Sequence, residues 1–145
     1  MIVRNKLLDA IEAGLPSVLG ENTSLFLNYD GKKSVDAFPA VFVTLPQDAV
    51  STYTDTDDDA YDSPSTMFLD ISLELTIWTK GKYRYKRLNE IRQECANWLA
   101  NKENFGDYVQ DIVFESYEED EDVDKEKSIW ELNGTMTYTV VVNAT

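Results

Sequence analysis

Aspartate side chains crowd into one stretch of the chain, where their carboxylates are the groups that could do chemistry. Five fall within eight positions, at Asp55, Asp57, Asp58, Asp59 and Asp62. Carboxylate oxygens suit Ca²⁺ or Mg²⁺, but the stretch lacks the central glycine and terminal glutamate of an EF-hand loop. A loosely bound cation that quiets charge repulsion is compatible with this pattern. Catalysis is not expected there, because no general base of tuned pKa and no rigid cleft accompany the aspartates.

Other catalytic arrangements are missing from the sequence. It contains no histidine, which excludes Ser-His-Asp, Cys-His and histidine-metal sites, and its six glycines are scattered and form no phosphate-binding loop. The single cysteine, Cys95, cannot form an internal disulfide and lies on the apolar stripe of an expected helix. We interpret it as a buried thiol in a reducing compartment. We therefore expect no enzymatic activity, no cofactor and no metal centre.

Basic side chains gather at a second place. Six of the 13 basic residues fall within 13 positions, and they are Lys80, Lys82, Arg84, Lys86, Arg87 and Arg92. The cluster is one-sided and interleaved with Tyr83 and Tyr85, which favours a positive interface that meets an acidic surface of a partner. A solvated helix start and a nucleic-acid-binding patch are the alternatives.

The net charge of −14, from 27 acidic and 13 basic residues, weighs against the nucleic-acid alternative. Six acidic residues lie between Asp48 and Asp62 and seven between Glu118 and Glu126. Loops this acidic repel phosphate, although a solvated, solubilising surface explains them equally well. The length of 145 residues and 43% hydrophobic content predict one domain spanning residues 1–145. No leader pattern and no apolar run of about 18 residues is found, so we expect a soluble, cytoplasmic protein without a membrane partner.

A long hairpin must position the aspartates. Its first strand is the apolar run Ala40–Leu45, closed by Pro46, and its second is the alternating stretch Met67–Trp78. Between them lies an acidic loop at residues 47–64, which we expect to gain order when it meets a partner. Alternation directs Leu69, Ile71, Leu73, Leu75 and Ile77 to the core, and sends Phe68 and Trp78 to the opposite face.

Two helices are predicted from apolar residues spaced three and four apart. The first covers residues 2–13, because Gly14 supplies a stop and Pro16 forbids continuation. The second runs from about Tyr83 to Ala100, and its expected buried stripe is Leu88, Ile91, Cys95, Trp98 and Leu99.

Three further strands complete the pattern. Residues 25–29 and 109–117 give shorter strand signals. The stretch from Trp130 to Val142 alternates clearly, and one of its faces is Trp130, Leu132, Gly134, Met136, Tyr138, Val140 and Val142. Gly134 marks a bulge or a close backbone approach. The element order is therefore α-β-β-β-α-β-β. We predict an α+β fold, in which a mostly antiparallel sheet carries two helices packed on one face.

Several of these segments together resemble the tail terminator family of long-tailed phages, the minor tail protein U-like proteins. The resemblance begins in the opening helix at Arg4–Ile11 and continues through the Phe38-Pro39-Ala40-Val41 strand, the Asp/Thr/Tyr loop and the long alternating strand. It returns in the acidic residues Glu118–Asp124, in Ile129-Trp130 and in the strand Thr135–Val142. The acidic loops are longer than the family pattern.

The resemblance implies a structural role in the phage virion. Such subunits close into a six-membered ring on the tail tube, stop its polymerisation and present the surface for head attachment. The implied partners are other copies of the chain, the tail tube protein and a head–neck connector, while DNA passes through the lumen without specific binding. An acidic subunit suits that last demand, because like charges discourage sticking.

Head-to-tail closure of a ring needs two complementary patches on each subunit. The expected acidic patch is Asp55, Asp57, Asp58 and Asp59, and the basic one is Lys82, Arg84, Lys86 and Arg87. The outward Phe68 and Trp78 would add apolar surface. Another phage neck or head-completion protein, or a small acidic cytoplasmic adaptor, stays open as an alternative, and the size of the particle in solution distinguishes them.

Overall fold

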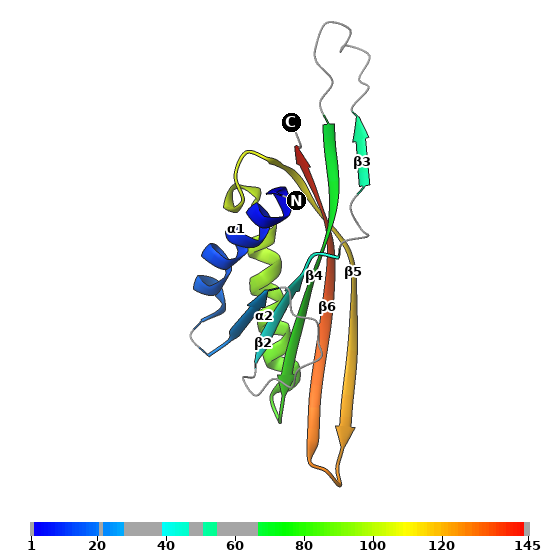
Figure 1. Cartoon of the computed structure of the whole chain (residues 1–145). Coiled ribbons are helices and arrows are strands. Elements are labelled where there is room, and N and C mark those ends of the chain that lie inside the picture. The colour runs from blue at the N-terminus through cyan, green and yellow to red at the C-terminus, as the bar shows by residue number, and fades with distance from the viewer. Residues whose placement is uncertain (1, 21, 28–38, 47–50, 55–66, 144–145) are drawn as a thin grey trace, which may run out of the picture.

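The computed structural model describes residues 2–20, 22–27, 39–46, 51–54 and 67–143 of the chain. Two long helices lie on one face of a twisted sheet (Figure 1), as the α+β prediction required. The helices are α1 (Ile2–Leu19) and α2 (Arg84–Leu99), followed by the short 3₁₀ helix η3 (Lys102–Asn104). The strands are β1 (Ser24–Leu27), β2 (Ala40–Thr44), β3 (Ser51–Thr54), β4 (Met67–Lys80), β5 (Val109–Asp124) and β6 (Ile129–Asn143).

The sheet has six strands in the order β1-β2-β4-β6-β5, with β3 attached to β4. Only the β1–β2 pair is parallel among the described strands, so the sheet is mostly antiparallel, as predicted. Strand β6 pairs along nearly all of β4. The other edge of β4 is shared by β2, opposite residues 74–78, and by β3, opposite residues 67–70.

The core lies between the sheet and the two helices. Its sheet side comes from alternate residues of β4 and β6, and the predicted phase of both strands is confirmed by the burial of Leu69, Ile71, Leu73, Leu75, Ile77, Leu132, Met136, Tyr138, Val140 and Val142. Its helix side includes the whole predicted stripe of α2, from Leu88 to Leu99. Both strands and helix thus follow from one rule, that apolar residues recur with the period of the element that buries them.

The predicted end of the first helix is wrong. Helix α1 continues through Pro16 to Leu19, because Leu15 and Leu19 extend the buried stripe of the earlier turns. A proline inside a helix costs about 3 kcal/mol. Burial of two leucines contributes roughly 1.5–3 kcal/mol each, which offsets that cost.

Gly14 belongs to the contact between the helices and is not a helix stop. A Cβ atom at Gly14 would lie 2.5 Å from Cζ2 of Trp98, so the glycine lets α1 approach the indole of α2. The residue that ends the helix is Gly20, whose φ of +83° is the left-handed conformation common after a helix C-terminus.

Strand β5 is longer than predicted, and this changes the interpretation of the second acidic stretch. Residues Glu118–Asp124 are paired strand and do not form a loop, since each finds a partner along β6. Charged side chains are well tolerated on an edge strand, where they also discourage unwanted pairing. The turn follows at Asp124, whose Oδ1 accepts hydrogen bonds from the amides of Glu126 (3.1 Å) and Lys127 (3.3 Å).

The expected loop at residues 47–64 contains a strand. Ser51–Thr54 forms β3 and pairs with the first residues of β4, so the hairpin continues beyond Pro46. Thr and Tyr are residue types enriched in strands, in keeping with this pairing. The rest of the loop, including Asp55, Asp57, Asp58 and Asp59, lies outside the described residues. Within the described part of the chain, no helix has both the length and the apolar character needed to cross a bilayer.

Candidate interaction surfaces

The basic cluster lies at the start of α2, and Arg84 is used inside the subunit. Its Nη2 lies 3.0 Å from Oε2 of Glu121 on β5, and its Nε donates to the same oxygen at 3.1 Å. The guanidinium also covers the ring of Trp130, at 5.5 Å from the centroid. Only 13% of the Arg84 side chain is exposed. The predicted basic patch therefore loses one member to a contact between the helix and the edge strand.

Glu121 accepts a second hydrogen bond, from the hydroxyl of Tyr85. The hydrogen bond from Tyr85, together with the charge and hydrogen bond of Arg84, lowers the pKa of Glu121 against the opposing effect of desolvation. The same hydrogen bond raises the pKa of Tyr85. The three side chains fasten α2 to the far half of β5.

A second contact between α2 and β5 lies about two helical turns further along α2. The guanidinium carbon of Arg92 sits 3.6 Å from the centre of the Tyr117 ring, a cation–π contact. The Tyr117 hydroxyl donates to Oε1 of Glu119 at 2.6 Å. Burial and then this hydrogen bond raise the pKa of Tyr117, and Arg92 opposes the shift.

Tyr117 also explains Gly134. A Cβ atom at Gly134 would lie 2.5 Å from the Tyr117 hydroxyl oxygen, so the glycine makes room for the ring. The pairing of β6 with both neighbours is continuous at Gly134. Of the two explanations predicted for this glycine, close approach is therefore right and a bulge is wrong. The bulges are in β5, between Val109 and Asp111 and between Phe114 and Ser116.

The remaining cations surround an open hollow of about 590 Å³ on the other flank of α2. We call it the cationic pocket, and its lining is Lys80, Lys82, Tyr83, Lys86, Arg87 and Glu90. Arg87 is paired with Glu90 at 2.9 Å, one turn along the helix. Lys82 lies 5.6 Å from the centre of the Tyr83 ring, and Tyr83 itself is 64% exposed. Lys82 and Lys86 form no ion pair with any described residue.

Phe68 and Trp78 lie on the sheet face opposite the helices, as alternation predicted, and both are half-buried. Trp78 meets Phe42 edge-on at 5.7 Å, and Phe42 stacks on Phe26 at 5.2 Å. Phe42 is only 5% exposed. The indole of Trp78 therefore takes part in an aromatic row that crosses three strands of the subunit.

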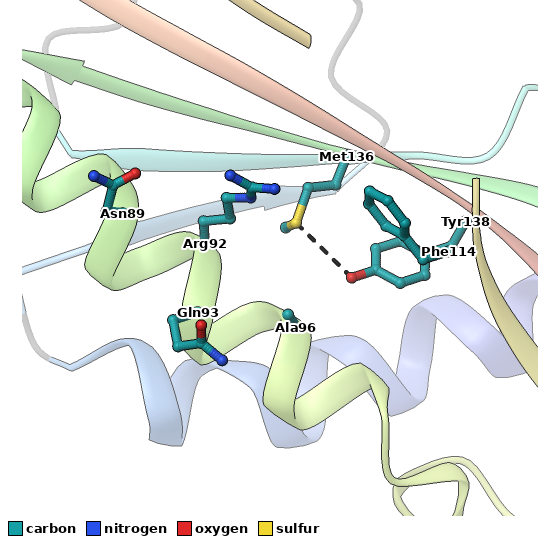
Figure 2. A pocket seen from close by; sticks show the side chains of 7 residues that line it. All are labelled: Asn89, Arg92, Gln93, Ala96, Phe114, Met136 and Tyr138. Carbon is teal, nitrogen blue, oxygen red and sulfur yellow. Dashed lines mark hydrogen bonds between the residues drawn. The ribbon is translucent and has the colours of Figure 1, made fainter. Parts of the chain in front are cut away.

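Sequence reasoning missed a groove between α2 and the β5–β6 hairpin, shown in Figure 2. It measures about 560 Å³, and its lining is Asn89, Arg92, Gln93, Ala96, Phe114, Met136 and Tyr138. Phe114 is 50% exposed and packs edge-on against Tyr138 at 5.5 Å. The Tyr138 hydroxyl donates to Sδ of Met136 at 3.9 Å. The bulge beside Phe114 breaks the alternation of β5, so no simple period marks this aromatic residue.

Groups suited to catalysis are sparse in the described part of the chain. There, no three or more acidic or cysteine side chains are grouped so that they could hold a metal ion. Cys95 is fully buried, and burial, helped by the charge of Glu94, raises its thiol pKa to about 12. The nucleophilic thiolate is therefore scarce at neutral pH. The described surfaces carry exposed charge and exposed aromatic side chains.

Comparison with known proteins gives a match in structure only. No family model matches the sequence, and no curated protein does. Among solved structures, the fold is similar to a chain from the virion of a native gene transfer agent particle, with a TM-score of 0.51. The match covers 98% of this chain and 92% of that chain at 10% sequence identity. The two chains therefore share a fold over nearly their whole lengths.

Proposed function

We propose that this protein is a structural component of a phage-type virion and, within it, the tail terminator. The observation that carries the virion role is the correspondence in fold, over 98% of this chain, with a chain of a gene transfer agent virion. The finer role of tail terminator rests on the resemblance of the strand and loop pattern to that family. In this role the protein forms a six-membered ring that caps the tail tube and carries the head–neck connector.

The surfaces of the subunit suit such a role. Closure of a ring from identical subunits needs two different patches that complement each other. The cationic pocket is one candidate, and the acidic residues that make up most of the charge supply the other. A net charge of −14 also suits a ring through which DNA passes without specific binding. None of these tasks requires catalysis, a cofactor or a metal.

The first test is the size of the particle. Native mass measurement and negative-stain images of the purified protein, alone and with tail tubes, should reveal a closed ring of six copies. A protein that stays monomeric under both conditions is not a terminator, and an acidic adaptor then becomes the better description. A ring that binds the head connector but leaves tube length unchanged points to another neck or head-completion protein.

The second test is the length of the tail. Particles made without the gene should carry overlong tubes, and the wild-type gene should restore normal length. The variant Lys82→Glu/Lys86→Glu should fail to restore it while the subunit stays folded. Lys6→Glu/Lys102→Glu, the same change in charge at exposed sites outside the cationic pocket, is the matched control. Arg84 is left intact, because glutamate there would face Glu121 and disturb the fold.

A further inference from the structure

Strand β5 divides its acidic residues between two faces. Glu119 and Glu121 face α2, where Tyr117, Arg84 and Tyr85 engage them. The alternate residues point to the opposite face of the sheet, and we call them the carboxylate row: Glu118, Asp120 and Asp122. All three are exposed, and their carboxylates form no hydrogen bond or ion pair with any described residue.

The register adds a further carboxylate to this row. Asp122 stands directly opposite Glu131 of β6, and like charges in that position are destabilising. Lys80 of β4 stands opposite Glu131 on its other side, so it can balance one of these charges. Arg84 and Arg92 lie on the helix face and are engaged by Glu121 and Tyr117. The row therefore keeps an excess of negative charge that nearby cations do not balance.

The carboxylate row and the cationic pocket lie at the same position along the strands but at opposite edges of the sheet. Lys80, Glu131 and Asp122 form one line across β4, β6 and β5. The pocket is built from the end of β4, the following turn and the start of α2, and it contains no residue of β5. Because β2 pairs with β4 only as far as Trp78, β4 is the edge at Lys80 within the described residues.

We propose that the carboxylate row of one subunit binds the cationic pocket of the next copy of this chain. The proposal rests on the ring-forming function proposed above and names the contact that closes the ring. A second copy of the chain fits the cationic pocket because its carboxylate row carries the opposite charge. The two patches lie at the same position along the strands, so two subunits can meet side by side. Since the two patches differ, the contact is heterologous and can close a ring. The exposed Tyr83 supplies aromatic surface beside the charges.

Charge reversal on each side tests this contact. Lys82→Glu/Lys86→Glu and Asp120→Lys/Asp122→Lys should each raise the concentration needed for ring assembly by about tenfold or more. The variant that combines all four changes has the wild-type net charge and should recover assembly. Circular dichroism and thermal melting check that each subunit is folded, and Lys6→Glu/Lys102→Glu controls for net charge. The readout is native mass in the presence and absence of tail tubes.

Engineered cysteines give a second, independent measurement. Lys86→Cys together with Asp120→Cys should form disulfides between subunits under mild oxidation, with a ladder that ends at the closed ring. Each single variant should give no ladder. Cys95 is buried and does not interfere.

The outcomes separate this contact from the function itself. Two results overturn the contact but leave the terminator function standing. One is failure of the combined charge variant to assemble. The other is absence of the disulfide ladder when the Lys86→Cys/Asp120→Cys variant forms rings as the wild type does. If Asp55→Lys/Asp57→Lys instead restores ring assembly to Lys82→Glu/Lys86→Glu, the cationic pocket binds the acidic loop at residues 47–64. That result also overturns the contact with the carboxylate row. A wild-type protein that never assembles, with or without tubes, overturns both proposals.

Discussion

At the scale of single residues, charge on this protein has two separate uses. Arg84 and Arg92 fasten α2 to β5 through Glu121 and Tyr117, whereas Lys82 and Lys86 remain on the surface without an ion pair in the described structure. Neighbouring cations in the sequence thus differ in function because the helix turns them to different sides. The second pair is exposed and can contact another molecule.

The contact at Glu121 predicts a dependence of stability on pH. Its folded-state pKa lies below the unfolded value of about 4.3, so its stabilisation is fully present above that pH. It is lost as the pH falls through the lower folded-state pKa. Glu121→Gln should therefore lower the Tm at neutral pH, and the difference from wild type should fade below about pH 4. Glu118→Gln, which removes the same charge from the opposite face, is the control. Equal changes in Tm for the two variants would contradict a stabilising contact of Glu121 with Arg84 and Tyr85.

At the scale of elements, two alternating strands and the buried stripes of both helices form most of the core. Leu73 is fully buried in the middle of β4, opposite Tyr138 of β6 and between the stretches of β4 that pair with β2 and with β3. The helices reach this part of the sheet through residues such as Ile91 and Trp98. The core is continuous, so loss of volume at its centre is felt by strand and helix together.

Leu73→Ala should lower the free energy of unfolding by about 2–5 kcal/mol, through lost burial and the cavity left behind. Ser72→Ala, one residue away on the opposite face, should change it by no more than about 0.5 kcal/mol. Chemical denaturation of both variants measures the difference. A Leu73→Ala variant as stable as Ser72→Ala would mean that β4 has the opposite phase.

The close contact between α1 and α2 predicts that replacing a helical glycine by alanine destabilises this protein. Glycine to alanine inside a helix normally stabilises by up to about 1 kcal/mol. Gly14→Ala should instead lower the free energy of unfolding by about 1–3 kcal/mol, because the new methyl would meet Trp98 at 2.5 Å. Glu12→Ala, at an exposed position of the same helix, is the control and should stay within about 0.5 kcal/mol in chemical denaturation. A more stable Gly14→Ala would show that the two helices pack less closely.

At the scale of the whole molecule, negative charge dominates the surface. The long β5–β6 hairpin carries much of it along one edge of the sheet (Figure 1), on both faces of β5. The cations form a smaller area at the start of α2. This separation suits contact between copies and disfavours contact with DNA.

The charge distribution predicts that the protein does not bind double-stranded DNA. Gel-shift or fluorescence-anisotropy measurements near physiological ionic strength should find no binding, because the field around the subunit repels phosphate. A variant with Asp120→Lys/Asp122→Lys should bind DNA more strongly than wild type at low salt. Tight, salt-sensitive binding by the wild type would contradict the proposal that DNA passes freely through a ring of this protein.

The sequence by itself determined the elements whose pattern is local. The alternation of Leu69 to Ile77 and the spacing of Leu88 to Leu99 each record burial on one side of a strand or helix, and both predictions are confirmed. The α+β class and the helices on one face followed from them. Periodicity is readable without partners, because an element must present one face to the core whatever covers it.

Only the tertiary structure decided where elements end and which side chains meet. Helix α1 passes Pro16 because burial of Leu15 and Leu19 outweighs a local preference to stop. The acidic end of β5 is a strand because β6 offers it a register, and Arg84 is held by a glutamate 37 residues away. Such outcomes depend on contacts between distant segments, and local residue preferences carry no information about those contacts.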